Sequence, residues 1–248
     1  MKKTFFGILI AGVLGMSTGA VEAQAGDAGI SGDIGVYSQY MWRGMQQTPN
    51  ASVQGDLGVD IIDGLSANVW FAAPLGTRAG QVNYTEFDWT IDYSREISGL
   101  NYSLGYIFYS YLNNATSNTG EVYFGLGYGP VSATYYYATN SNVGGWKKNS
   151  YLDVALSQNV GGFDLGADFG FYFGKVSTSI PANHINEFPT TKKGLGHVDL
   201  SVSKDVALND HVTMTPSLMV SIPTWKDAVT NKRPRNSNQI VAGVNFSY

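Results

Sequence analysis

Hydrophobic and polar residues alternate with a period of two along nearly the whole chain after residue 26. The last ten residues show the pattern most clearly, because Ile240, Ala242, Val244, Phe246 and Tyr248 fall on one parity and the residues between them are mostly small or polar. Successive side chains of a β-strand point to opposite faces, so this period predicts a strand with one apolar and one polar face. The pattern recurs about twelve times, which predicts an all-β fold of antiparallel strands.

The predicted connections alternate in length. Short joins contain glycine, as at Asp63-Gly64 and Gly129-Pro130, and are typical of tight hairpin turns. The joins between them, such as 44–50, 174–193 and 222–236, are mostly longer and more polar. Outer-membrane barrels have an even number of strands, short periplasmic turns and longer extracellular loops. The sequence therefore predicts a transmembrane antiparallel up-and-down β-barrel of about twelve strands with both termini periplasmic.

The period alone does not say which face points outward, since a soluble lipocalin-like barrel alternates equally well. The polar face carries many mid-strand carboxylates, and an ionised group on a lipid face costs several kcal/mol. On the apolar face, aromatic residues gather at both strand ends, with Tyr40 and Trp42 at a loop end and Tyr93 and Tyr128 at turn ends. Aromatic girdles of this kind mark the two interfaces of a membrane. We therefore expect the apolar face to meet lipid and the polar face to line a lumen.

Composition and the N-terminus agree with export to a membrane. Only 14% of the residues are charged, well below the roughly 25% of a soluble domain. Lys2 and Lys3 precede an apolar run over 5–16 and then small-residue cleavage sites, which predicts a signal peptide over 1–23, with cleavage after 25 as the alternative. The apolar run is short against the ~20 residues of a spanning helix. A single barrel domain over 26–248 in the bacterial outer membrane is expected.

The inward face is rich in acids, and Arg43 is the one inward lysine or arginine that the pattern places there. Such a lumen would carry a negative potential that concentrates cations. Individual acids could instead be hydrated or brace the wall through tyrosines. The predicted pore-lining residues are Gln39, Arg43, Asp56, Trp70, Glu86, Asp88, Glu121, Tyr136, Asp153, Asp168, His197 and Asp199. They predict a narrow, cation-preferring lumen for passive diffusion of small hydrophilic solutes.

Other function classes receive little support from the sequence. His184, His197 and His211 have no spacing that suggests a nucleophile and its base or a metal cage, so no catalytic residue, metal or cofactor is expected. Export and a formal net charge of -4 argue against nucleic-acid binding. Basic residues in the predicted long loops, such as Arg78 and Lys193, could bind the phosphates of lipopolysaccharide. Outer-membrane lipid and the outer-membrane assembly machinery are the other expected partners.

The segment Tyr37-Ser38-Gln39-Tyr40-Met41-Trp42-Arg43-Gly44, followed by Val53-Gln54-Gly55-Asp56, resembles the N-terminal signature of the TorF-like porins, a proteobacterial family of unknown function. The resemblance implies an outer-membrane porin-like barrel and supplies neither a substrate nor catalytic residues. Two alternatives stay open beside the channel. One is a closed or plugged barrel with a structural or surface-binding role, in which 174–193 folds inward or projects. The other, less favoured, is an outer-membrane lipid hydrolase.

Overall fold

The structure is a computed structural model that describes residues 29–48, 50–76, 85–112, 114–141, 147–174, 194–224 and 238–248. The predicted signal peptide, most of the predicted loop over 174–193 and the loop residues Arg78 and Lys193 lie outside these ranges. Twelve long strands form the wall: β1 (Ile30–Tyr37), β4 (Ser52–Ile62), β5 (Leu65–Pro74), β6 (Glu86–Ile97), β7 (Leu100–Tyr111), β8 (Thr119–Tyr128), β9 (Val131–Ser141), β10 (Ser150–Val160), β11 (Phe163–Phe173), β12 (Gly194–Ser203), β14 (Thr213–Pro223) and β15 (Gln239–Ser247).

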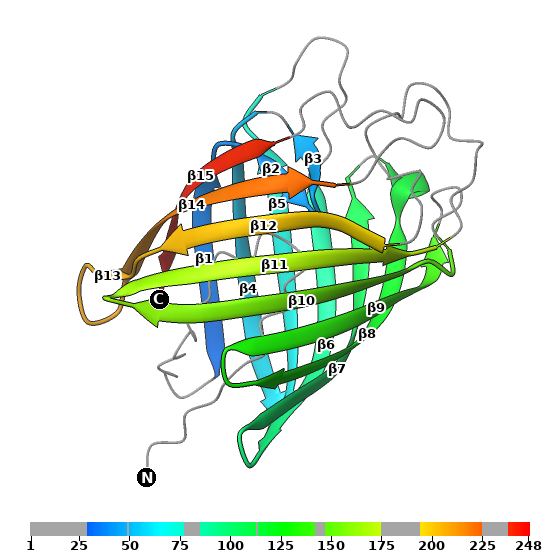
Figure 1. Ribbon diagram of the computed structural model, residues 1–248, viewed down its shortest axis with the longest axis horizontal. Helices are drawn as coiled ribbons and strands as arrows, with labels where there is room; N and C mark the ends of the chain where they lie inside the picture. The colour runs from blue at the N-terminus through cyan, green and yellow to red at the C-terminus, as the bar shows by residue number, and fades with distance from the viewer. Residues whose placement is uncertain are drawn as a thin grey trace.

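The wall is a closed antiparallel barrel (Figure 1). Each strand pairs with its neighbours along the chain, and β1 pairs with both β4 and β15, so the sheet returns on itself. The two-residue strand β13 (Val206–Ala207) adds only a short spur on β14. A membrane-spanning sheet must close in this way, because an open edge would leave backbone groups unpaired with no water to satisfy them. The predicted fold class and strand number are confirmed.

One end of the barrel has tight turns. The wall strands β6 and β7 are joined by Ser98 and Gly99, both with positive φ, and β10 and β11 by Gly161 and Gly162, also with positive φ. Two positive φ values in succession are typical of the type I′ hairpin turn, whose twist matches that of the strands. The strands run a few residues further into these turns than the sequence pattern predicts. The first residues of β1 and the last of β15 meet at this same end, where Tyr248 N donates to Gly32 O.

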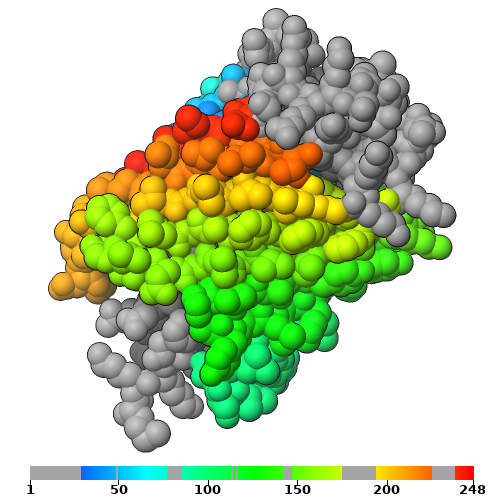
Figure 2. Space-filling view, in the orientation of Figure 1, coloured from blue at the N-terminus to red at the C-terminus, as the bar shows by residue number. Residues whose placement is uncertain are grey.

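The outer face of the wall is apolar. Large hydrophobic side chains are exposed all round the barrel, and they include Ile34, Leu57, Ile91, Leu104, Phe124, Leu156, Leu165, Leu200, Leu218 and Ile240. Figure 2 shows successive strands from β10 to β15 lying side by side on one face of this wall. None of the described residues forms a helix long and apolar enough to cross a membrane. An apolar belt of this extent would be a liability in water and suits a bilayer.

The first strand departs from the prediction. The alternation over 30–42 predicts one continuous wall strand, but β1 ends at Tyr37, and residues 40–48 form a small separate hairpin of β2 (Tyr40–Trp42) and β3 (Met45–Thr48). Tyr40 and Trp42, predicted to face lipid as girdle aromatics, are instead buried, with 3% and 9% of their surface exposed. The prediction is wrong because residues 40–42 form a short strand of their own, so Tyr40 and Trp42 keep the parity of the wall strand without belonging to it. Its partner β3 lies in the predicted loop over 44–50, so that loop is corrected too.

Candidate functional site

The β2–β3 hairpin lies inside the barrel, toward the end where the longer connections are (Figure 1). It leaves the wall where Ser38 N donates to Ala242 O at 2.8 Å, just after the last pair between β1 and β15. Its turn consists of Arg43 and Gly44, with φ of 49° and 74°. Arginine is uncommon in this left-handed region, and such strain persists only where the surroundings hold it. The turn of the hairpin is therefore the first place to look for function.

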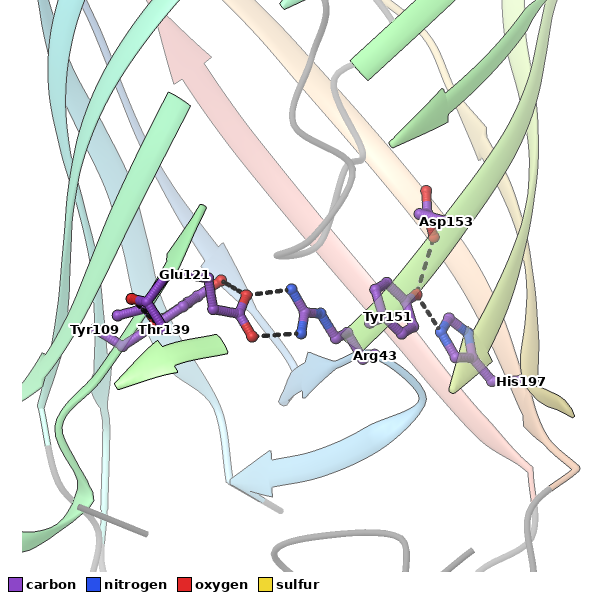
Figure 3. Close-up of polar contacts among 8 residues, drawn as sticks. Arg43, Tyr109, Glu121, Thr139, Tyr151, Asp153 and His197 are labelled. Atoms are coloured by element: carbon purple, nitrogen blue, oxygen red, sulfur yellow. Dashed lines mark hydrogen bonds and ion pairs between the residues drawn. The ribbon is translucent and has the colours of Figure 1, made fainter. Parts of the chain in front are cut away.

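The guanidinium of Arg43 is held by the carboxylate of Glu121, as Figure 3 shows, and by three aromatic rings. Arg43 Nη1 and Nη2 donate to Glu121 Oε1 and Oε2 at 3.1 and 2.7 Å, and these side chains are only 1% and 2% exposed. Tyr109 also donates to Glu121 Oε2, at 3.1 Å. The guanidinium carbon lies 4.3 Å from the ring centre of Tyr151 and 4.6 Å from those of Tyr136 and Trp42. Carboxylate forks and aromatic faces are the two surfaces that a planar guanidinium recognises best.

Tyrosines continue across the wall on both sides of this contact. Tyr123, Tyr136, Tyr151 and Tyr172 stand directly opposite one another on β8, β9, β10 and β11. Their ring centres are 5.7, 5.9 and 5.2 Å apart, within the range of favourable aromatic pairs. The Tyr172 hydroxyl donates to the backbone oxygen of Arg43 at 2.6 Å. The tyrosines therefore form one rail on the wall, and the tip of the hairpin rests on it.

His197 on β12 supports the other side of the turn. Its Nε2 lies 2.8 Å from the Tyr151 hydroxyl, which also donates to Asp153 at 2.9 Å, and its Nδ1 lies 3.1 Å from Asp199 Oδ2. A Cβ added at Gly44 would overlap the His197 side chain, so only glycine allows the turn to approach this closely. Gly44 therefore fits both the positive φ of the turn and the wall beside it.

The base of the hairpin is attached to β15, on the side of the wall away from the tyrosine rail. Gln39 Nε2 donates to Ile240 O at 2.9 Å, and Gln46 donates to Gln39 and, at 3.2 Å, to Gln239 Oε1. Met41 packs in a small cluster with Tyr37, Met219 and Val241. Across the lumen, the Tyr40 ring lies 5.3 Å from Trp70, and Trp42 lies 6.0 Å from Tyr109. The hairpin thus contacts wall strands on several sides of the lumen.

The predicted pore-lining residues all face the lumen, at two levels. Gln39 and Arg43 belong to the hairpin. Around it lie Trp70, Glu86, Asp88, Glu121, Tyr136, Asp153 and His197, of which all but Trp70 are buried. Further toward the turn end lie the half-buried Asp56, Asp168 and Asp199. The structure brings Arg43 onto Glu121 and Tyr136, and His197 onto Asp199, whereas Asp56 and Asp168 remain apart from the hairpin contacts.

Several inward acids brace the wall. Asp56 accepts from Asn68 at 2.5 Å, Asp164 accepts from Asn159 at 2.8 Å, and Asp92 accepts from Tyr123. Asp88 differs, because it is 3% exposed and interacts with the carboxyl group of Glu86. Among the described part of the chain, Arg43 is the inward-facing arginine or lysine, and His197 is the inward-facing histidine. The lumen therefore carries far more acidic than basic groups.

Sequence reasoning missed Tyr109 and Tyr151. Both share the parity of the inward face, Tyr151 with Asp153 and Tyr109 with Ser103, so the period could have placed them in the lumen. The contact of Tyr151 with Arg43 and that of Tyr109 with Glu121 and Trp42 had no signal in the pattern, since they depend on where the hairpin enters.

A family model matches residues 21–161, a range that includes the hairpin, Glu121 and most of the rail. The family is described as a bacterial protein of unknown function, Gcw_chp. The chain belongs to this family. The match does not confirm the TorF-like name. No curated protein matches the Gcw_chp chain.

Solved structures show that the Gcw_chp fold is that of outer-membrane barrels. The KdgM porin, solved with disordered oligogalacturonate, superposes with a TM-score of 0.50 at 11% identity over 88% of this chain and 98% of the other. Outer membrane phospholipase A from Escherichia coli is also similar, with a TM-score of 0.47 at 12% identity over 88% of this chain and 89% of the other. An outer membrane channel from Pseudomonas putida F1 has a TM-score of 0.47 at 8% identity over 92% of this chain and 97% of the other. Together with the apolar belt, the fold places the Gcw_chp chain in the bacterial outer membrane.

Proposed function

We propose that this Gcw_chp protein is a porin-like channel for small hydrophilic solutes, held closed by the β2–β3 hairpin. The observation that carries the proposal is the charge of the lumen. Carboxylates line it at the level of the hairpin and beyond it toward the turn end, and Arg43 is the inward arginine or lysine among the described residues. A barrel that only needed a filled interior would gain more from apolar side chains, because buried ion pairs stabilise little against hydrophobic replacements. The acids suit the passage of ions and polar solutes.

Cation preference follows from the same charges. With the hairpin withdrawn, Glu121 and Asp88 would lose the nearby positive charge of Arg43, and a ring of unbalanced carboxylates favours cations over anions. The narrowness of a twelve-stranded barrel and the tyrosine rail restrict passage to small solutes. The resemblance of residues 37–44 to the TorF-like porins supports the same function. With both termini on the periplasmic side, the hairpin would close the extracellular half.

The alternative is a permanently closed barrel with a structural or surface-binding role. The observation that favours it is the depth of the hairpin, whose residues are nearly all buried. An enzyme is not proposed, although some outer-membrane barrels are lipid hydrolases. His197 and Asp199 form a pair inside the lumen beneath the hairpin, away from the lipid face on which a lipid substrate would arrive.

Recording from the refolded mature chain in a planar bilayer under a salt gradient tests the proposal. We expect rare openings whose reversal potential favours the cation, and a weaker preference in the Asp56→Asn/Asp168→Asn double variant, since both acids face the lumen away from the hairpin contacts. Asp63→Asn is the matched control, because Asp63 lies exposed at a turn and pairs with Arg95. Anion preference would contradict the acidic-lumen account. A folded chain that never conducts, in the wild type and in a variant with a weakened hairpin, would favour the closed barrel.

A further inference from the structure

We propose that the wall pocket occupied by Arg43 is a binding site for small guanidinium-bearing cations, for which the hairpin is a built-in competitor. The pocket consists of Glu121, Tyr109, Tyr136 and Tyr151, here called the guanidinium cage. The inference deepens the proposed function by naming a solute class, and rests on it only for the physiological role of the site.

The guanidinium cage belongs to the wall. Tyr109, Glu121, Tyr136 and Tyr151 come from four successive strands, β7 to β10, and Tyr136 and Tyr151 are direct cross-strand neighbours. Backbone ladders fix these strands whether or not the hairpin is present. Tyr109 supports Glu121 through its hydrogen bond at 3.1 Å, so the carboxylate keeps its orientation without Arg43. Withdrawal of the hairpin would therefore leave a preformed site.

The shape of the cage selects a planar cation with two parallel donors. Both oxygens of Glu121 are engaged by separate nitrogens, at 3.1 and 2.7 Å, in the fork arrangement that an ammonium group does not reproduce. The rings of Tyr136 and Tyr151 lie at 4.6 and 4.3 Å from the guanidinium carbon. Cation–π contacts are strongest where the cation is desolvated in this way.

A second observation points to a cationic ligand at this level. Asp88 is 3% exposed and interacts with the carboxyl group of Glu86. It stands directly opposite Tyr109 of the cage across β6 and β7, and Tyr109 donates to Glu121. Three carboxyl groups thus lie beside a single guanidinium among the described residues. A solute that brings a further cation is more strongly attracted here than elsewhere along the wall.

The test removes the Arg43 side chain from the cage and supplies a free guanidinium compound in its place. In the refolded full mature chain carrying Arg43→Ala, we expect methylguanidinium to raise the thermal unfolding temperature in a saturable way. Methylammonium at equal concentration and ionic strength should bind at least about ten-fold more weakly, because it cannot engage both oxygens of Glu121. The wild type should show no saturable shift over the same range, since Arg43 fills the cage.

The matched control is the Arg43→Ala/Glu121→Gln double variant, which keeps the rings and loses the carboxylate. Equal shifts in the single and double variants, or equal shifts with the two cations, would overturn the proposal. If Arg43→Ala does not fold alone, the same comparison is made on its refolding yield, and methylguanidinium must restore the single variant and not the double one. Because the readout is binding, a silent channel that binds methylguanidinium contradicts the proposed function and leaves the site in place. A conducting channel whose Arg43→Ala variant does not bind methylguanidinium overturns the binding site and leaves the proposed channel function in place.

Discussion

Replacing Glu121 with glutamine should release the hairpin without opening the barrel wall. The substitution keeps the shape of the side chain and removes the charge that holds both Nη atoms of Arg43. Removing one partner of a buried ion pair costs about 3–5 kcal/mol, because the other charge is left uncompensated. Glutamine retains one acceptor oxygen and the ring contacts persist, so we take the lower end of this range, a loss of ~3 kcal/mol in the stability of the docked hairpin. At 1.4 kcal/mol for each factor of ten, the ratio of undocked to docked hairpin rises about 100-fold.

Single-channel recording reads this ratio as open probability. We expect the Glu121→Gln channel to be open about 100 times more often than the wild type while the latter is mostly closed. Glu96→Gln is the matched control, since Glu96 is exposed beside the β6–β7 turn and its loss should leave the open probability unchanged. An unchanged open probability in a correctly folded Glu121→Gln barrel would refute the assignment of Arg43 and Glu121 as the anchor of the hairpin.

Two further substitutions, each with a control, test the hairpin and the lipid face of the wall in turn. Gly44→Ala should also raise the open probability, because the new Cβ overlaps His197 and φ is 74°. Its control is Gly129→Ala, where φ is 56° and the space around the Cβ is open. This control should lose about 1 kcal/mol of stability and conduct like the wild type. Ile91→Lys, in the middle of the lipid face, should lower the free energy of unfolding in lipid vesicles by about 2–4 kcal/mol. Ile97→Lys, at the turn end of the same strand, should lower it by only about 0–1 kcal/mol. Tryptophan fluorescence follows the unfolding of both variants. Equal losses at the two positions would contradict the placement of the bilayer.

The barrel was predictable because its physics is local and repeated. Each wall strand alternates apolar and polar residues, and its turns carry glycine at the positions that need positive φ, so strand number, closure and the outward face follow from the sequence. The inward direction of Glu121 and Tyr136 follows from the same parity. These are properties that a single strand displays by itself.

The hairpin was not predictable in this way. Tyr40 and Trp42 keep the parity of the preceding wall strand, and the departure of the chain from the wall after Tyr37 depends on contacts with β14 and β15, about two hundred residues later. Tyr40 and Trp42 show the consequence, since aromatic residues near a strand end suit a membrane interface and an interior cluster equally well. The signal that the sequence does carry is the pair Arg43-Gly44, which forms the type I′ turn of the hairpin.

The most direct test of the account is to lock the hairpin to the wall and release it again. The chain has no cysteine, so a Gln46→Cys/Gln239→Cys pair, whose parent side chains meet at 3.2 Å, can be bridged selectively by a short thiol-reactive crosslinker and released by reduction. We expect conductance in the Glu121→Gln background to disappear on crosslinking and to return on reduction. Conductance that persists through a complete crosslink would show that solutes do not need the hairpin to move, and would contradict its role as the closing element.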